Sequence, residues 1–155
     1  MRNKIFQLIS IVTILLSSSI SFAAEGVIAE VSDHYKAMPM YYDLNRMPVE
    51  QISPNIGRRF IMGTQSSLVR WDLKAGTKLP LHFHINEQIT SVKEGVLAVY
   101  SQGNKYTLRP GQMMIFPPNV PHEFVAVEDV VIIEVHTPGR QDFINGEFNN
   151  NLNKQ

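Results

Sequence analysis

The chain has 155 residues, of which 44% are hydrophobic and 18% are charged, a composition that suits one globular domain. It contains no cysteine, so disulfides and thiolate metal ligands are excluded. The formal net charge is +0 at pH 7, so nothing favours nucleic acid or an acidic membrane surface as a partner.

The first residues predict a secretory signal peptide over residues 1–23. Arg2 and Lys4 form a short basic region, residues 5–16 are mostly apolar, and Ser21 and Ala23 are the small residues before a cleavage site. The apolar run is short for a transmembrane span, so we expect no stable membrane insertion. A periplasmic or secreted location follows from this interpretation.

Residues 24–50 are interpreted as an N-terminal arm. Its tyrosines and methionines have no obvious burial of their own, and Pro39 and Pro48 interrupt the pattern. We therefore expect the arm at the subunit contact of a homodimer. His34 lies in this arm, away from the other histidines, and is not expected to bind metal.

Residues 51–144 show a β-pattern throughout. Strands of five to seven residues are separated by turns rich in glycine, proline and asparagine, and no amphipathic helix is evident. This pattern predicts an all-β barrel or jelly roll. The predicted strands include residues 59–63, 68–73, 96–100, 105–108, 113–116, 123–127 and 130–136. Residues 145–155 are polar and asparagine-rich, which predicts a flexible C-terminal tail.

Two stretches supply candidate metal ligands. Between Gly76 and Gly95, His82 and His84 alternate with apolar residues, so on a strand both point to one face, as does Gln88. Glu87 would point the other way, unless a bulge in the backbone makes it the ligand instead. A second stretch, after Gly111, adds His122.

Three imidazoles and one amide oxygen form a ligand set for a divalent transition metal such as Ni, Zn, Fe, Cu or Mn. The alternative is a barrel whose histidines are only hydrogen-bonded. Near the C-terminus, Glu134 and His136 share one face of the last predicted strand, and Arg140 follows it. A carboxylate, an imidazole and a guanidinium beside such a metal suit proton transfer on a small anionic molecule.

The motifs G-x5-H-x-H and G-x5-P-x4-H, about twenty residues apart, resemble the two motifs of the cupins. The form H-x-H-x-x-E-Q and the ending T-P-G-R-Q-D-F resemble the KdgF-like tautomerases of pectin degradation. Asn119 stands where a glycine is usual and Ala126 where an asparagine is common. Glu134 and His136 stand where those tautomerases have an aspartate and a phenylalanine facing the metal, and Arg140 matches their arginine.

The resemblance implies a cupin double-stranded β-helix, a bound divalent metal and a role in isomerising a carboxylated sugar. The implied substrate is a 4,5-unsaturated uronate that is converted to its linear keto form. Glu134, His136 and Arg140 are then the expected catalytic residues, with Arg140 forming a bidentate pair with the substrate carboxylate.

Two other functions stay open. One is an iron-dependent cupin dioxygenase, which the neutral Gln88 argues against because four neutral ligands disfavour oxidation of the metal to the trivalent state. The other is a non-enzymatic periplasmic module that binds a small anion. With four neutral ligands the metal keeps a charge near +2, so Gln88→Glu is expected to retain or tighten the metal and to weaken an anionic ligand.

Overall fold

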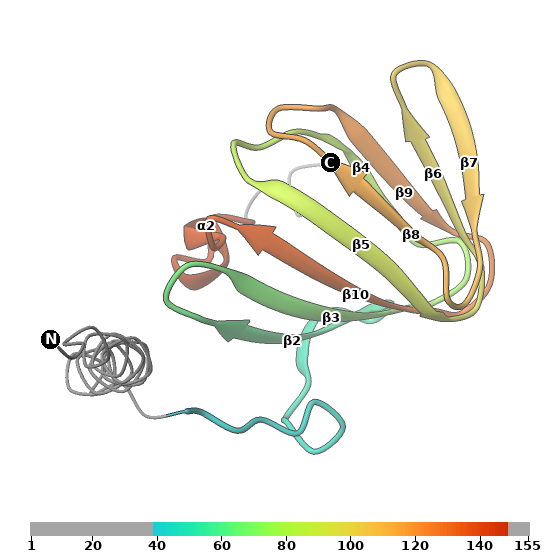
Figure 1. The fold of residues 1–155 in the computed structure, drawn as a ribbon. Helices are drawn as coiled ribbons and strands as arrows, with labels where there is room; N and C mark the ends of the chain where they lie inside the picture. Colours follow the sequence, from blue (N-terminus) through green and yellow to red (C-terminus); the bar gives the residue numbers. More distant parts are fainter. Residues whose placement is uncertain (1–38, 149–155) are drawn as a thin grey trace, which may run out of the picture. The chain divides into compact units, whose positions relative to one another are not determined.

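Within the described residues, ten strands form two antiparallel sheets that face each other. The structure is a computed structural model, and it describes residues 39–148. The larger sheet has the strand order β1-β2-β3-β10-β5-β8 and the smaller one the order β4-β9-β6-β7 (Figure 1). The elements are β1 (Glu50–Ser53), β2 (Ile56–Met62), β3 (Ser67–Leu73), β4 (Lys78–His82), β5 (Glu87–Glu94), β6 (Leu97–Ser101), β7 (Asn104–Leu108), β8 (Met113–Phe116), β9 (His122–Ala126), β10 (Val130–Thr137) and α2 (Gln141–Ile144).

The strands follow the alternation that the sequence predicts. In β3 and β10 every second residue is buried and the residues between are half-buried, as expected of strands with one face on a core. The predicted all-β jelly roll is confirmed, and the predicted strands recur with boundaries shifted by up to three residues. The stretch from His82 to Gln88 is not one continuous strand, because β4 ends at His82 and β5 begins at Glu87.

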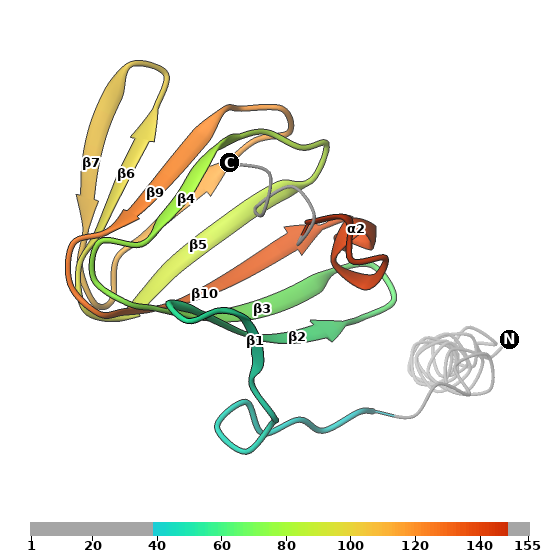
Figure 2. The same cartoon turned by 180° about the vertical axis from the view of Figure 1, so that it is seen from behind.

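The core lies between the two sheets. It combines side chains from both, including Trp71 and Ile132 from the larger sheet and Leu97 and Phe124 from the smaller one. The short helix α2 lies at the end of β10 (Figure 2) and buries Phe143 against the Trp71 ring, with ring centroids 5.9 Å apart. Burying this apolar surface is the main stabilising contribution to the fold.

Turn residues adopt the conformations that their positions require. Asn119, which stands where a glycine is usual, has a φ of 63°, a left-handed conformation that asparagine tolerates better than most residues. Gly95 has a φ of 75°, and a Cβ there would lie 2.1 Å from the Asp129 carbonyl oxygen. Only glycine fits at this position, where the β5–β6 turn passes close to the backbone of the β9–β10 turn.

The predicted signal peptide and most of the predicted arm lie outside the described residues. Of the arm's last residues, Asn45 accepts a hydrogen bond from Arg70, the Met47 carbonyl accepts one from Arg59, and Glu50 begins β1. Of the predicted tail, Phe148 packs against the Trp71 ring at a centroid distance of 5.4 Å. The subunit contact remains a prediction.

Candidate metal centre

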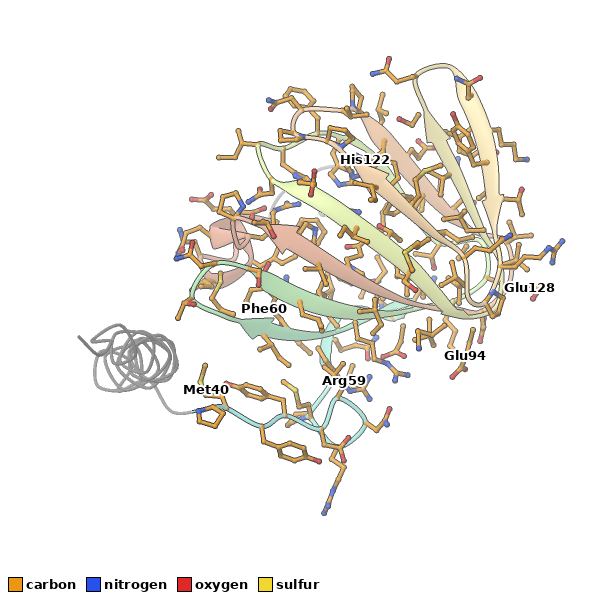
Figure 3. All side chains as sticks on the ribbon, viewed as in Figure 1. Met40, Arg59, Phe60, Glu94, His122 and Glu128 are labelled. Carbon is orange, nitrogen blue, oxygen red and sulfur yellow. The ribbon has the colours of Figure 1, made fainter. Side chains whose placement is uncertain are left out.

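Three histidines meet at one end of the barrel. His82 ends β4, His122 begins β9, and the two residues are direct partners across the antiparallel pair. His84 follows in the connection to β5. The three rings can each offer one nitrogen, and these atoms lie within 4.8 Å of one another. Figure 3 shows His122 at this end, away from Glu94 at the end of β5 and Glu128 in the β9–β10 turn.

The backbone fixes the tautomer of each ring. The Nδ1 atoms of His82, His84 and His122 lie 2.7, 2.9 and 2.8 Å from the carbonyl oxygens of Pro80, Asn86 and Val120. A carbonyl oxygen only accepts, so each Nδ1 donates its proton and each Nε2 carries a lone pair. His122 Nε2 is buried without a hydrogen-bond partner. This arrangement fits a divalent metal, whose bonds to imidazole nitrogen are about 2.1 Å long.

Gln88 extends the set with an oxygen. Its Oε1 lies 3.0 Å from His84 Nε2, while its Nε2 donates to Thr90 Oγ1 at 2.8 Å and to Glu134 Oε1 at 3.0 Å. Both Gln88 Oε1 and His84 Nε2 are acceptors, so their approach is unfavourable unless a cation lies between them. Gln88 is 1% exposed, whereas Glu87 is exposed on the other face of β5. The alternative with Glu87 as the ligand finds no support in this geometry.

The expected catalytic residues of β10 lie beside Gln88. His136 is the register partner of Gln88, and Glu134 is the partner of Thr90, so the antiparallel β5–β10 pair brings all four side chains together. His136 Nε2 donates to Gln88 Oε1 at 3.0 Å, and its Nδ1 is buried without a partner. Glu134 is 3% exposed and also accepts from Trp71 Nε1 at 2.8 Å.

Burial keeps these groups in the protonation states that a metal requires. Desolvation, with the nearby positive charge of Arg140, lowers the pKa of His84 to about 4 and that of His136 to about 2. Desolvation also lowers the pKa of His122 to about 3. The rings are therefore neutral at pH 7 and free to act as ligands. Burial raises the pKa of Glu134 to about 7, against the hydrogen bond from Trp71 and the charge of Arg140.

Arg140 lies close enough to influence the whole cluster but is already paired. Its Nε and Nη2 donate to the Asp142 carboxylate at 2.7 and 2.6 Å, and its backbone N–H donates to Ser67 Oγ. The guanidinium carbon lies 4.5 Å from the centroid of the Phe143 ring. A bidentate pair with a substrate carboxylate would therefore use the other edge of the guanidinium, formed by Nη1 and Nη2.

The sequence did not single out several supporting residues. Thr90 shares the parity of Gln88 on β5, so its inward position followed from the same alternation. The Asn86 amide donates to the Pro138 carbonyl at 2.6 Å and thereby joins the His84 connection to the segment before Arg140. The Arg58 side chain is buried beside Phe143 and Trp71. These contacts of Asn86 and Arg58 could not be predicted from the sequence, because they depend on the tertiary arrangement of the strands.

Comparisons with known proteins agree with this architecture. Residues 69–136 match the family model described as a cupin domain. The structure is similar to that of KdgF from Halomonas sp., with 25% sequence identity and a TM-score of 0.65 over 68% of this chain and 99% of that one.

Two further structures share the fold. An RmlC-like cupin from Shewanella frigidimarina NCIMB 400 has 23% identity and a TM-score of 0.64 over 68% of this chain and 96% of that one. Oxalate decarboxylase from Bacillus subtilis, described with Mn(II) centres, has 18% identity and a TM-score of 0.59 over 67% of this chain and 30% of that one. A search of curated proteins found no match. In the part of the chain that the structure describes, no helix is long and apolar enough to cross a membrane.

Proposed function

We propose that this protein, whose residues 69–136 form a cupin domain, is a metal-dependent tautomerase acting on a small carboxylated sugar such as a 4,5-unsaturated uronate. The observation that carries the proposal is the convergence of three imidazoles with the Gln88 amide oxygen beside an arginine. The similarity to KdgF supports the substrate class, since that relative is matched over nearly its whole length.

Each group has a role in this proposal. A divalent metal held by His82, His84, His122 and Gln88 would act as a Lewis acid toward a substrate oxygen. Arg140 would attract the substrate carboxylate through the guanidinium edge that Asp142 leaves free. His136 is the candidate for proton transfer, because its Nδ1 is a buried acceptor without a partner. Both oxygens of Glu134 already accept hydrogen bonds from the protein.

The test exposes metal-loaded protein to a panel of 4,5-unsaturated uronates and follows the ultraviolet absorbance of the conjugated alkene. The proposal predicts loss of this absorbance faster than in buffer, and no acceleration with chelator-treated protein or with His82→Ala. Uronate binding without any acceleration would instead identify a binding module. Consumption of dioxygen would indicate a dioxygenase.

The location and assembly of the mature protein are part of the proposal. The basic and apolar pattern of residues 1–23 supports export, with a mature chain that begins near Ala24 and acts in the periplasm or outside the cell. N-terminal sequencing that finds Met1 intact in a membrane fraction would contradict this. The proposed homodimer would be contradicted by a monomeric mass in light scattering.

A further inference from the structure

Glu134 and Gln88 face each other directly beneath the histidine cluster. We propose that Glu134 is a positioning residue, which fixes the end of the Gln88 amide that points to the three histidines. This inference rests on the proposed metal site, and it assigns to Glu134 a role other than proton transfer to substrate.

The two ends of an amide are nearly equal in size, so hydrogen bonds decide its orientation. On the histidine side, the lone pair of His84 Nε2 would favour the flipped amide, because Gln88 Nε2 could then donate to it. That orientation would place an N–H group, which cannot bind a cation, where a ligand oxygen is needed. His84 would therefore turn Gln88 the wrong way for metal binding, against the hydrogen bond that His136 Nε2 donates to Gln88 Oε1 at 3.0 Å.

The opposite side of the amide imposes the other orientation. Glu134 Oε1 accepts from Gln88 Nε2 at 3.0 Å, and the flipped amide would bring two acceptor oxygens together at that distance. The Thr90 hydroxyl accepts from Gln88 Nε2 at 2.8 Å and donates to Glu134 Oε1 at 3.3 Å. A hydrogen bond to a carboxylate is stronger than one between neutral groups. Glu134 therefore outweighs the preference of His84.

Glu134 is itself held in place. Trp71 Nε1 donates to its second oxygen at 2.8 Å, so three donors converge on the carboxylate, and the side chain is almost completely buried. Its atoms are engaged with the protein rather than open to a substrate.

This geometry predicts that residues 88 and 134 can exchange their chemical groups. Glu134→Gln gives residue 134 only one acceptor oxygen, so either Trp71 loses its partner or the Gln88 amide flips. Gln88→Glu alone sets two carboxylates face to face. In Gln88→Glu/Glu134→Gln, one oxygen of Glu at position 88 can face the histidines, and its other oxygen can accept from the new amide.

The experiment compares the Ni²⁺ affinity of wild type, Glu134→Gln and the double variant by isothermal titration of metal-free full-length protein. Circular dichroism in chelator checks that each is folded. We expect Glu134→Gln to weaken Ni²⁺ binding about 10–100-fold, the usual effect of removing the partner of a metal ligand. We expect the double variant to recover most of that loss and to bind Ni²⁺ more tightly than Gln88→Glu alone, measured alongside. A merely structural role of Glu134 would not make the double variant better than Gln88→Glu alone. Trp71→Phe, which removes one donor to Glu134 but none to Gln88, is the matched control and should weaken Ni²⁺ less.

A second measurement needs no variant. In the wild type, nuclear Overhauser effects should connect the Gln88 side-chain amide protons to Thr90, and effects to the His84 ring instead would overturn the inference. Unchanged Ni²⁺ affinity in Glu134→Gln, or a folded double variant no better than that single variant, would also overturn it while leaving the proposed function intact. A wild-type chain that binds no divalent metal would overturn both.

Discussion

On the inner face of β10, the first two side chains and the last two are equally buried, but different interactions stabilise them. We call the first pair the apolar half and the second pair the polar half. Val130 and Ile132 pair with Leu73 and Trp71 in the larger sheet and belong to the apolar core. Glu134 and His136, on the same face of the same strand, are 3% and 0% exposed. An apolar side chain gains from leaving water, whereas a buried polar one loses unless its hydrogen bonds are replaced. Burial therefore does not distinguish core from site, but hydrogen-bonding capacity does.

Trp71 joins the two halves. Its ring packs against Phe143 in the core, while its Nε1 donates to Glu134 in the site. The apolar half supplies the rigidity that holds the polar half in register. If the two halves are as separate as this comparison implies, mutations in one should change stability and mutations in the other should change ligand binding.

The largest expected effect is on stability, at the apolar half. Ile132→Ala removes a fully buried side chain from the core and should lower the free energy of unfolding by about 2–5 kcal/mol, measured by urea denaturation. Metal affinity of the folded fraction should change little. Ile133→Ala, on the half-buried outer face of the same strand, is the control and should cost less. Equal losses from the two substitutions would contradict the placement of the core.

The polar half predicts the reverse outcome. His82→Ala should lower the affinity for a divalent metal by about a hundredfold or more, because the metal loses one of its three imidazole ligands. The unfolding midpoint in chelator should change little, since His82 is outside the apolar core. His34→Ala, at a histidine outside both motifs, should bind metal like wild type. Loss of metal in His34→Ala but not in His82→Ala would place the site elsewhere.

Most residues of the polar half and of the histidine cluster could be predicted from the sequence. Alternation placed Glu134 and His136 on one face of β10, and the motifs that hold His82, His84 and His122 resembled those of the cupins, which implied that these histidines meet at one metal. Gln88 was placed by assuming a continuous strand, and it reaches the cluster although β4 ends at His82 and β5 begins only at Glu87. The hydrogen bond from Gln88 to Glu134 was not predictable, because strand pairing and amide orientation are tertiary features.

That hydrogen bond revises one expectation. Four neutral ligands suggested that Gln88→Glu would simply retain or tighten the metal. With Glu134 Oε1 only 3.0 Å from Gln88 Nε2, this substitution also sets two carboxylates against each other. The single variant therefore carries a repulsion that could not be expected from the sequence alone.

Arg140 tests whether substrate binding is separable from metal binding. Arg140→Ala should raise KM for an unsaturated uronate about ten- to a hundredfold, the effect of losing a charge-assisted pair of about 1.5–3 kcal/mol. The metal content should stay that of wild type. Arg109→Ala, at an exposed arginine, serves as the control. Full activity of Arg140→Ala would reject the proposed role of this residue.

A further expected effect concerns the pH dependence of the stability of the metal-free protein. Burial lowers the pKa values of His84, His122 and His136 to about 4, 3 and 2, so below pH 6.5 the unfolded chain takes up protons that the folded chain does not. The free energy of unfolding should therefore fall as the pH drops from 6.5 towards 4. Glu134, whose pKa burial raises to about 7, acts in the opposite direction between pH 7 and 4.5, but it is one group against three.

Urea denaturation in chelator at pH 7.5, 6 and 4.5 measures this dependence. His84→Ala removes one of the contributing groups and should show a shallower decline. A stability that is constant or rises on acidification would show that these histidines are not buried as neutral rings.

We propose that one end of the barrel binds a divalent metal through three imidazoles and one amide. Anomalous X-ray diffraction from crystals grown with Ni²⁺ would locate the metal. We expect one strong peak within bonding distance of the Nε2 atoms of His82, His84 and His122 and of Gln88 Oε1. A peak bound by Glu87 or by the Glu134 carboxylate, or the lack of any peak among these histidines, would contradict it.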